Sequence, residues 1–265
     1  MFKKFKKIMS ISLQENMEYK FNFITSLICS FIPLAVNSLI WFSISDYSAE
    51  AYGYSLNEMI TYYFVMMIIT NIVYCDIAWR MSNEIRYGGL TQYLLKPCRY
   101  INYVFYFDLP KRLVFVIFGT IPILMLYLFI HRFLVLDINL FVFTCFLVSL
   151  CIGYIINFLL YYMLGLFSFF LSEVGGIIMG YTILVNVLAG KVFPLSLLPG
   201  VVGEIVAFTP FQYTGFVSAS IIQSKYQTTD ILLTLGGGII WIAILWFCCE
   251  YLWRLGNKKY AAFGG

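Results

Sequence analysis

The stretch GKVFPLSLLPGVVGEIVAFTPFQY, residues 190–213, decides how the rest of the chain must be arranged. It is apolar enough to enter a membrane, but Pro194, Pro199 and Pro210 interrupt it, and it also contains one Lys and one Glu. Proline removes a backbone donor and clashes with the preceding helical turn, so these residues break a continuous helix. Whether the stretch crosses the membrane or turns back depends on the segments around it.

The composition places the chain in a membrane rather than in water. Hydrophobic residues make up 62% of the sequence and charged residues 11%, whereas soluble domains average about 45–50% and about 25%. A chain of this length that is apolar on all sides cannot hide its surface in one water-soluble core. We therefore expect an all-α polytopic membrane protein, with a single transmembrane domain over residues 1–265.

Six segments are apolar over the length that a bilayer requires, which is about 20 residues at a rise of about 1.5 Å each. The fourth of them is longer than one crossing needs. No compact apolar core with a cleavage site follows the basic start, so a cleaved signal peptide is not expected. The expected spans cover residues 21–44, 57–79, 112–130, 138–171, 175–193 and 231–253.

The Lys and Arg residues predict the orientation, because cytoplasmic loops are enriched in both. Five precede the first span, six lie between the second and third, three follow the last, and Arg132, Lys191 and Lys225 fall on the opposite side. Both termini and the loop 80–111 are therefore expected in the cytoplasm, which requires an even number of crossings. Residues 194–226 are predicted to enter from the outer face and turn back as a re-entrant pair of short helices.

Two cytoplasmic segments are expected to be helical without crossing the membrane. Residues 1–20 place apolar side chains at three- and four-residue spacing among Lys and Glu, which is typical of a basic amphipathic helix in the inner interface. A plain positively charged anchor is the alternative. In the loop, Ser82 or Asn83 is expected to cap a short helix and Gly88–Gly89 to end it. The aromatic residues that follow suit an interfacial belt: Tyr100, Tyr103, Phe105, Tyr106 and Phe107.

No pattern in the sequence indicates catalysis or a bound metal. His131 is the single histidine, the seven Cys form no C-x-x-C pair, and no nucleotide-binding G-x-x-x-x-G-K-[ST] motif occurs. The net charge of +4 is interpreted as a topology signal, so no nucleic-acid partner is expected. Mid-span acids that would serve an ion-coupled relay are not visible. Asn71, Asn157 and Asn186 are interpreted as interhelical hydrogen-bonding residues, with ligand binding as the alternative.

Several motifs occur in a fixed order along the chain. EIRYGGLTQYLLKP follows the second span, and the Pro-broken GKVFPLSLLP follows the fifth. Together they resemble the permease subunit of bacterial type-2 ATP-binding-cassette (ABC-2) exporters, in its compact branch, and the resemblance covers the whole chain. The stretches that carry it are SLQENMEYKFNF (12–23), GYSLNEMITYY (53–63), EIRYGGLTQYLLKP (84–97), GKVFPLSLLP (190–199), TPFQY (209–213) and KYAAFGG (259–265).

The resemblance implies partners and sites. It implies two separate ATPase subunits that hold ATP and Mg, so this chain needs no cofactor of its own, and a second permease chain, identical or related. The short helix after span two would be the coupling helix docking on the ATPase, with Ser82, Asn83, Glu84, Ile85, Arg86, Gly88, Gly89, Leu90 and Tyr93. The re-entrant segment would lie at the outer exit of the substrate path, with gate residues Gly190, Pro194, Pro199, Glu204, Pro210 and Phe211.

The expected function is export across the bacterial plasma membrane, with a tail at 254–265 on the cytoplasmic side. The substrate classes that the resemblance allows are lipids, peptides, antibiotics and glycans. The chain itself is not expected to be an enzyme. Two rival classes stay open: an ion-coupled secondary transporter or channel, and a membrane immunity or sensor protein without transport. An ATPase chain that co-purifies would decide against both.

Overall fold

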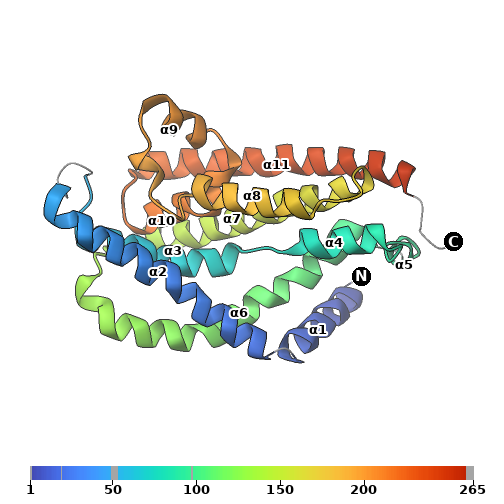
Figure 1. The fold of residues 1–265 in the computed structure, drawn as a ribbon, viewed down its shortest axis with the longest axis horizontal. Helices are drawn as coiled ribbons and strands as arrows, with labels where there is room; N and C mark the ends of the chain where they lie inside the picture. The colour runs from blue at the N-terminus through green and yellow to red at the C-terminus, as the bar shows by residue number, and fades with distance from the viewer. Residues whose placement is uncertain (1, 19, 49–52, 97, 261–265) are drawn as a thin grey trace.

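The computed structural model describes residues 2–18, 20–48, 53–96 and 98–260, and these contain helices and no strand (Figure 1). Residues 261–265 of the predicted tail and Pro97 lie outside the described residues. The α-helices are α1 Phe2–Glu18, α2 Lys20–Ser48, α3 Leu56–Val73, α4 Ile77–Arg86, α5 Thr91–Leu94, α6 Tyr100–Ile130, α7 Leu140–Leu166, α8 Gly175–Leu188, α9 Gly200–Ala207, α10 Phe216–Ile222 and α11 Thr228–Lys259.

Four helical stretches are long and apolar enough to cross a membrane, namely Leu56–Arg86, Tyr100–Phe133, Leu140–Phe169 and Thr228–Lys259. Two shorter apolar helices, Ile28–Ser43 and Gly175–Leu188, occur among the described residues as well. Because several such helices lie side by side, the chain is a multi-pass membrane protein. Each of the six predicted spans contains a helix, but the second and third have other bounds, and the fifth ends at Leu188 rather than at residue 193.

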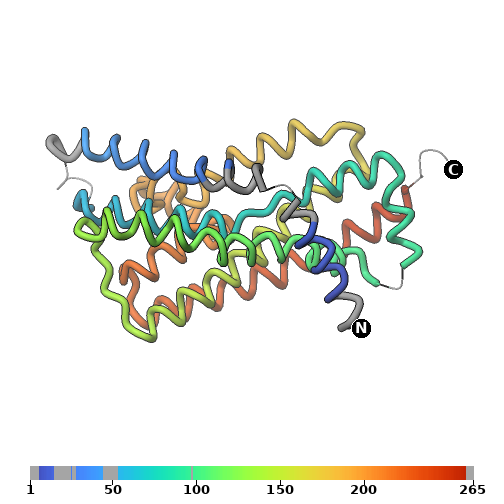
Figure 2. Tube along the Cα trace, turned by 90° about the horizontal axis from the view of Figure 1, so that it is seen from below, coloured from blue at the N-terminus to red at the C-terminus, as the bar shows by residue number. Residues whose placement is uncertain are grey.

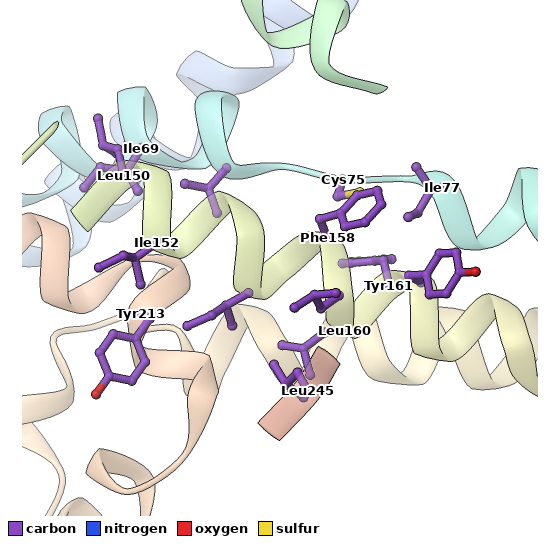
Figure 3. Packing of buried hydrophobic residues seen from close by; sticks show 14 of the residues in the cluster. Ile69, Cys75, Ile77, Leu150, Ile152, Phe158, Leu160, Tyr161, Tyr213 and Leu245 are labelled. Atoms are coloured by element: carbon purple, nitrogen blue, oxygen red, sulfur yellow. The ribbon is translucent and has the colours of Figure 1, made fainter. Parts of the chain in front are cut away.

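The core is built around α7, which packs against α3, α4, α10 and α11. This helix is apolar on all sides, as expected of a helix surrounded by other helices. Ile156, Leu159 and Leu166 are at most 1% exposed. Figure 3 shows α7 side chains such as Phe158 and Leu160 between the segment at Cys75 and the α11 residue Leu245. The central position of α7 fixes where the shorter elements can attach.

Elements gather at two ends of the bundle (Figures 1 and 2). What we call the α5 end holds α5, the start of α6 and the last turns of α11, where Thr91 contacts Tyr260. What we call the α9 end holds the start of α3, the end of α6 and residues 189–227, where Ser224 bonds the carbonyl of Asp137. Helix α1 packs on α6 through the buried Ser12, whose hydroxyl donates to the Phe107 carbonyl at 2.6 Å.

The second and third predicted spans need correction. The second is interrupted at residues 74–76, which are not helical, and continues as α4. The third begins at Tyr100 rather than at residue 112, because Pro110 lies inside α6 without ending it. A helix tolerates an internal proline when neighbouring groups satisfy the freed carbonyl or the backbone adjusts locally. Most of the predicted loop 80–111 is consequently helical.

Two smaller predictions about this region are wrong. Ser82 and Asn83 do not cap α4, because the helix already begins at Ile77 and both residues lie inside it. The predicted interfacial belt is wrong for three of its five aromatic residues, whereas Phe105 and Tyr106 are half-buried. All five lie in the first turns of α6, where Tyr100, Tyr103 and Phe107 are buried against other helices.

Candidate functional site

The predicted coupling segment folds as a helix, a tight turn and one further helical turn. Helix α4 ends at Arg86, and Gly88 has a φ of +78°, a left-handed conformation that favours glycine. The amide of Leu90 then donates to the Glu84 carbonyl at 2.8 Å, which closes the turn. The predicted role of the glycines at the end of the helix is therefore confirmed for Gly88.

One face of this segment is buried and so cannot contact a partner. Ser82 is 3% exposed and Ile85 4%, because α4 packs against α7, and Leu90 in the turn after α4 is 0% exposed. These predicted contact residues lie inside the bundle, where they attach the segment to it. Gly165 of α7 permits the close approach, since a Cβ added there would lie 2.8 Å from the Cβ of Met81.

The opposite face of the same segment is open. Tyr87 is 73% exposed and Leu95 is 83% exposed. We call this exposed set the α4–α5 surface, and it consists of Asn83, Tyr87, Thr91, Gln92, Leu94 and Leu95. Only Asn83 among them was singled out from the sequence. The others are exposed because the turn at Gly88 sets the direction of the residues that follow it. The sequence predicted that turn, but we did not use it to predict which side chains are exposed.

Glu84 and Arg80 join α4 to α6 through a polar network. Arg80 Nε donates to Glu84 Oε1 at 2.8 Å, and the Tyr100 hydroxyl donates to Glu84 Oε2 at 2.5 Å. Arg80 Nη2 also donates to the Tyr103 hydroxyl at 3.1 Å, and the Arg80 guanidinium lies 3.6 Å from the centroid of the Phe107 ring. Charge-assisted hydrogen bonds of this kind are about twice as strong as neutral ones. The segment is consequently held on α6 as well as on α7.

Tyr93 and the remaining predicted residues lie at the rim of this network. The centroids of the Tyr93 and Tyr103 rings are 4.4 Å apart, with the rings tilted by 35°, and the two hydroxyls are 3.1 Å apart. Arg86 pairs with Glu173 at 3.2 Å on the surface. A Cβ added at Gly89 would make ordinary contact with Glu84 at 3.5 Å, so this position, unlike Gly88, does not require glycine.

The three residues 74–76 form a joint between α3 and α4, and we call it the joint. Asn157 of α7 donates from Nδ2 to the carbonyl of Val73 at 2.7 Å, which satisfies a backbone group freed by the break. Lys111 of α6 pairs with Asp76 at 2.9 Å. Figure 3 shows Cys75 on this non-helical piece, facing α7. The joint is therefore tied by side chains to both neighbouring helices.

A buried ion pair lies beside the joint. Asp108 is 0% exposed, and it pairs with Arg112 at 3.2 Å one turn along α6. The Tyr154 hydroxyl of α7 donates to Asp108 Oδ2 at 3.0 Å. The guanidinium of Arg112 lies 5.3 Å from the centroid of the Tyr74 ring. We call Asp108, Arg112 and Tyr154 the clamp; the sequence had placed Asp108 before the span and assigned no role to it.

The predicted gate residues lie together at the α9 end, in an interval that contains the two short helices α9 and α10. Gly190 has a φ of +77°, and its carbonyl accepts a hydrogen bond from the Tyr62 hydroxyl at 2.5 Å. Pro194 and Pro210 are buried, Phe211 is partly buried, and Pro199 and Glu204 are exposed. The prolines begin the turns: Pro194 precedes a 3-10 turn, Pro199 precedes α9, and Pro210 begins another 3-10 turn.

The acidic and sulfur-containing side chains of the described residues are dispersed over the bundle. Among the described residues, no group of three or more His, Cys, Asp and Glu side chains could hold a metal ion. All seven cysteines are free: five lie in helices, and Cys75 and Cys98 lie in the links between helices. What the α5 end offers instead is a rigid helical unit with an exposed face, attached to three membrane helices.

Comparison with known families places the chain. No curated protein matches it. The sequence model of a family described as ABC-2 family transporter protein matches residues 15–264, which is nearly the whole chain and includes both ends of the bundle. The match agrees with the order of motifs in the sequence and with the several membrane-length helices of the structure. The chain therefore belongs to the ABC-2 family of transporter proteins, as a membrane permease of an ABC-type transporter.

Proposed function

We propose that the chain is the permease subunit of an ATP-driven exporter, coupled to two ATPase subunits and paired with a second permease. The observation that carries the proposal is the α4–α5 surface. It exposes Tyr87 and Leu95 at an end of the bundle, on a unit that the network and the joint hold rigidly. Exposed apolar side chains grouped in this way are typical of a protein interaction site.

The proposed topology has six crossings, made by α2, α3 with α4, α6, α7, α8 and α11. Two observations support it. The Lys and Arg residues of the sequence concentrate toward the α5 end, which is typical of a cytoplasmic side. In addition, α1 and the last turns of α11 both lie toward that end (Figure 1), as an even number of crossings requires. Helices α9 and α10 would then form the outer re-entrant segment.

The proposed coupling path follows the contacts of α4. A displacement of the α4–α5 surface reaches α6 through Glu84 and Tyr100, because their side chains are bonded at 2.5 Å. It reaches α3 through the joint, where the chain is continuous but not helical. ATP binding by the partner subunits can shift this arrangement only if ATP favours one conformation over the other.

The test is a pull-down of the ATPase partner with single substitutions on the permease. Leu95→Asp should abolish association with the ATPase, because it puts a charge on the most exposed apolar side chain of the α4–α5 surface. Phe208→Ser is the matched control: Phe208 is 82% exposed, but at the α9 end. Normal ATPase association and normal coupled ATP hydrolysis in the Leu95→Asp variant would contradict the proposal.

The ion-coupled alternative depends on whether an acid is available to bind an ion. Asp108 is the buried carboxylate that such a transporter would use. Its two oxygens are both occupied, one by Arg112 and the other by Tyr154. Asp76, beside it, is paired with Lys111. These contacts favour a structural role for the clamp and support an ATP-driven mechanism over an ion-driven one.

A further inference from the structure

A pocket of about 310 Å³ lies between α2, α3 and the residues that follow α8. Its walls are apolar over much of their length, with Pro33 and Leu34 from α2 and Met66 and Met67 from α3. Along α3 the lining extends from Tyr63 to Asn71, which is about 12 Å at a rise of about 1.5 Å per residue. The pocket is therefore an elongated apolar space that runs down from the α9 end.

Lys191 lines the α9 side of this pocket. It is half-buried, and its side chain forms no hydrogen bond or ion pair with another described residue. The neighbouring Lys225, in contrast, is paired with Glu58. No Asp or Glu is among the described residues that line the pocket, so nothing there balances the charge of Lys191.

The backbone on both sides of Lys191 is fixed by α3. The Tyr62 hydroxyl donates to the Gly190 carbonyl at 2.5 Å, and the Tyr63 hydroxyl donates to the Val192 carbonyl at 2.9 Å. A Cβ added at Gly190 would lie 2.8 Å from the Tyr62 oxygen, so the close approach needs glycine. The position of the Lys191 side chain in the pocket is thus set by specific contacts.

Amide groups complete the polar lining. Asn37 of α2 and Asn186 of α8 line the pocket, and their side-chain amides make no hydrogen bond with another described residue. Asn71, at the far end of the lining of α3, already donates from Nδ2 to the Met67 carbonyl at 2.8 Å. Amide N–H groups and an ammonium are donors suited to the oxygens of a carboxylate or phosphate.

The pKa of Lys191 also favours an anionic ligand. Burial lowers the pKa of Lys191 to about 8, because removal of water disfavours the charged ammonium. An anionic group placed beside it would raise the pKa again and stabilise the charged ammonium by direct attraction. The other titratable group in the described lining is the Tyr63 phenol, which is already bonded to Val192.

We infer that this pocket binds an amphiphile whose anionic headgroup, a carboxylate or phosphate, lies on Lys191, Asn37 and Asn186 and whose apolar tail extends along Leu34, Met66 and Met67. The inference rests on the proposed function, because it identifies the chemical class of the exported substrate. Two sources share this chemistry: an anionic membrane lipid, and an anionic amphiphilic solute that the exporter expels.

Binding to the permease alone tests the inference without the ATPase. The purified chain is placed in nanodiscs of phosphatidylcholine and titrated with dodecyl phosphate, with zwitterionic dodecyl phosphocholine as the matched probe. Wild type should bind dodecyl phosphate at least about tenfold more tightly, since a hydrogen bond to a charged group is worth about 1.5–3 kcal/mol. Lys191→Met should abolish the preference, whereas Lys191→Arg should keep it.

Lys225→Met is the control variant, because Lys225 also lies at the α9 end but does not line the pocket. It should bind like the wild type. Equal affinity of wild type for the two probes, or an unchanged preference in Lys191→Met, overturns the inference. Unchanged preference in Lys191→Arg shows that the charge, rather than a loss of folding, is responsible.

A second arm separates the two sources of ligand. Phosphatidylglycerol is added to the nanodisc lipid at increasing mole fraction. Competition with dodecyl phosphate assigns the pocket to membrane lipid, and lack of competition assigns it to an exported solute. Because no ATPase is present, failure of this binding assay is distinct from failure of the pull-down that tests the coupling surface.

Discussion

The two halves of α3 are joined to the rest of the bundle by different chemistry. At the carboxyl end of α3 the joint is fixed by charged and amide side chains from α6 and α7, with Asp76 on Lys111 and Asn157 on the Val73 carbonyl. At the α9 end the chain is held by tyrosine hydroxyls that bond the carbonyls of Gly190 and Val192. An ion pair and an amide hydrogen bond hold the joint, whereas neutral tyrosine hydrogen bonds hold the backbone on both sides of Lys191, although the α9 end also has the partly exposed Lys225–Glu58 ion pair.

The difference matches the roles that we propose. A unit that transmits force from an ATPase must stay in one arrangement with its helices, and the α5 end has a network and a clamp. A segment beside a ligand pocket must let the ligand leave. Each neutral tyrosine hydrogen bond around Lys191 is weaker than a hydrogen bond to a charged group. Four substitutions probe this comparison, beginning with the one expected to have the largest effect.

Asp108→Ala should destabilise the protein most, because it leaves Arg112, whose side chain is only 11% exposed, without its partner. Loss of one member of a buried pair costs about 3–5 kcal/mol. Thermal unfolding in detergent measures the effect. Glu173→Gln is the control, since its ion pair with Arg86 is exposed and is worth at most about 1 kcal/mol. Equal unfolding temperatures for the two variants would show that the clamp contributes little.

Gly165→Ala should come next, at about 1–3 kcal/mol, which is typical of an overpacked contact. The added methyl would lie 2.8 Å from the Cβ of Met81 and would push α4 away from α7. We expect a lower unfolding temperature together with weaker coupling of ATP hydrolysis to substrate. Gly180→Ala provides the comparison, because nothing lies within 4 Å of a Cβ there. If both variants have the same unfolding temperature and the same coupling, the close packing of α4 on Gly165 contributes to neither stability nor coupling.

Tyr62→Phe should cost about 1 kcal/mol, the usual net value of one hydrogen bond. It keeps the ring in place but removes the donor to Gly190 at the α9 end. We expect reduced dodecyl phosphate binding with little change in ATPase association. Tyr54→Phe serves as the control, since its bond to Ser196 is exposed. Loss of ATPase association in Tyr62→Phe would mean that the two ends are not separable.

Glu204→Ala should have the smallest effect. Glu204 is exposed on α9 and makes no ion pair with another described residue, and surface changes of this kind usually stay within about 0.5 kcal/mol. Transport assayed in cells should equal that of the wild type. A clear loss of transport would indicate that Glu204 contacts the substrate or the second permease at the outer exit.

Much of the helical framework was predictable, because it depends on local patterns. Apolar runs predicted where the long helices lie. The glycine at position 88 predicted the end of α4, and the structure shows the left-handed backbone there. The errors came from residues that usually interrupt helices. Pro110 lies inside α6, and the charged Asp108 and Arg112 near it are tolerated because they pair with each other. The start of α6 was therefore predicted wrongly, because the pairing of these residues in the folded chain was not taken into account.

The site residues were less predictable, because exposure is a property of the folded bundle. Ser82, Ile85 and Leu90 were expected to face a partner but are buried in the bundle, while Leu95 was overlooked and is 83% exposed. Both groups belong to the same short stretch of sequence. Which face of α4 turns outward is decided by the close contact between Met81 and Gly165, two residues far apart in the chain.

By itself the sequence determined that the protein is an all-helical membrane protein, where its apolar helices lie and which transporter family it resembles. These properties follow from composition and from patterns within a few turns of helix. Only the tertiary structure decided which side of α4 is free, how Asp108 is neutralised and that Lys191 faces an apolar pocket. Those depend on contacts such as Tyr62 with Gly190 and Tyr154 with Asp108, between residues far apart in sequence that only folding brings together.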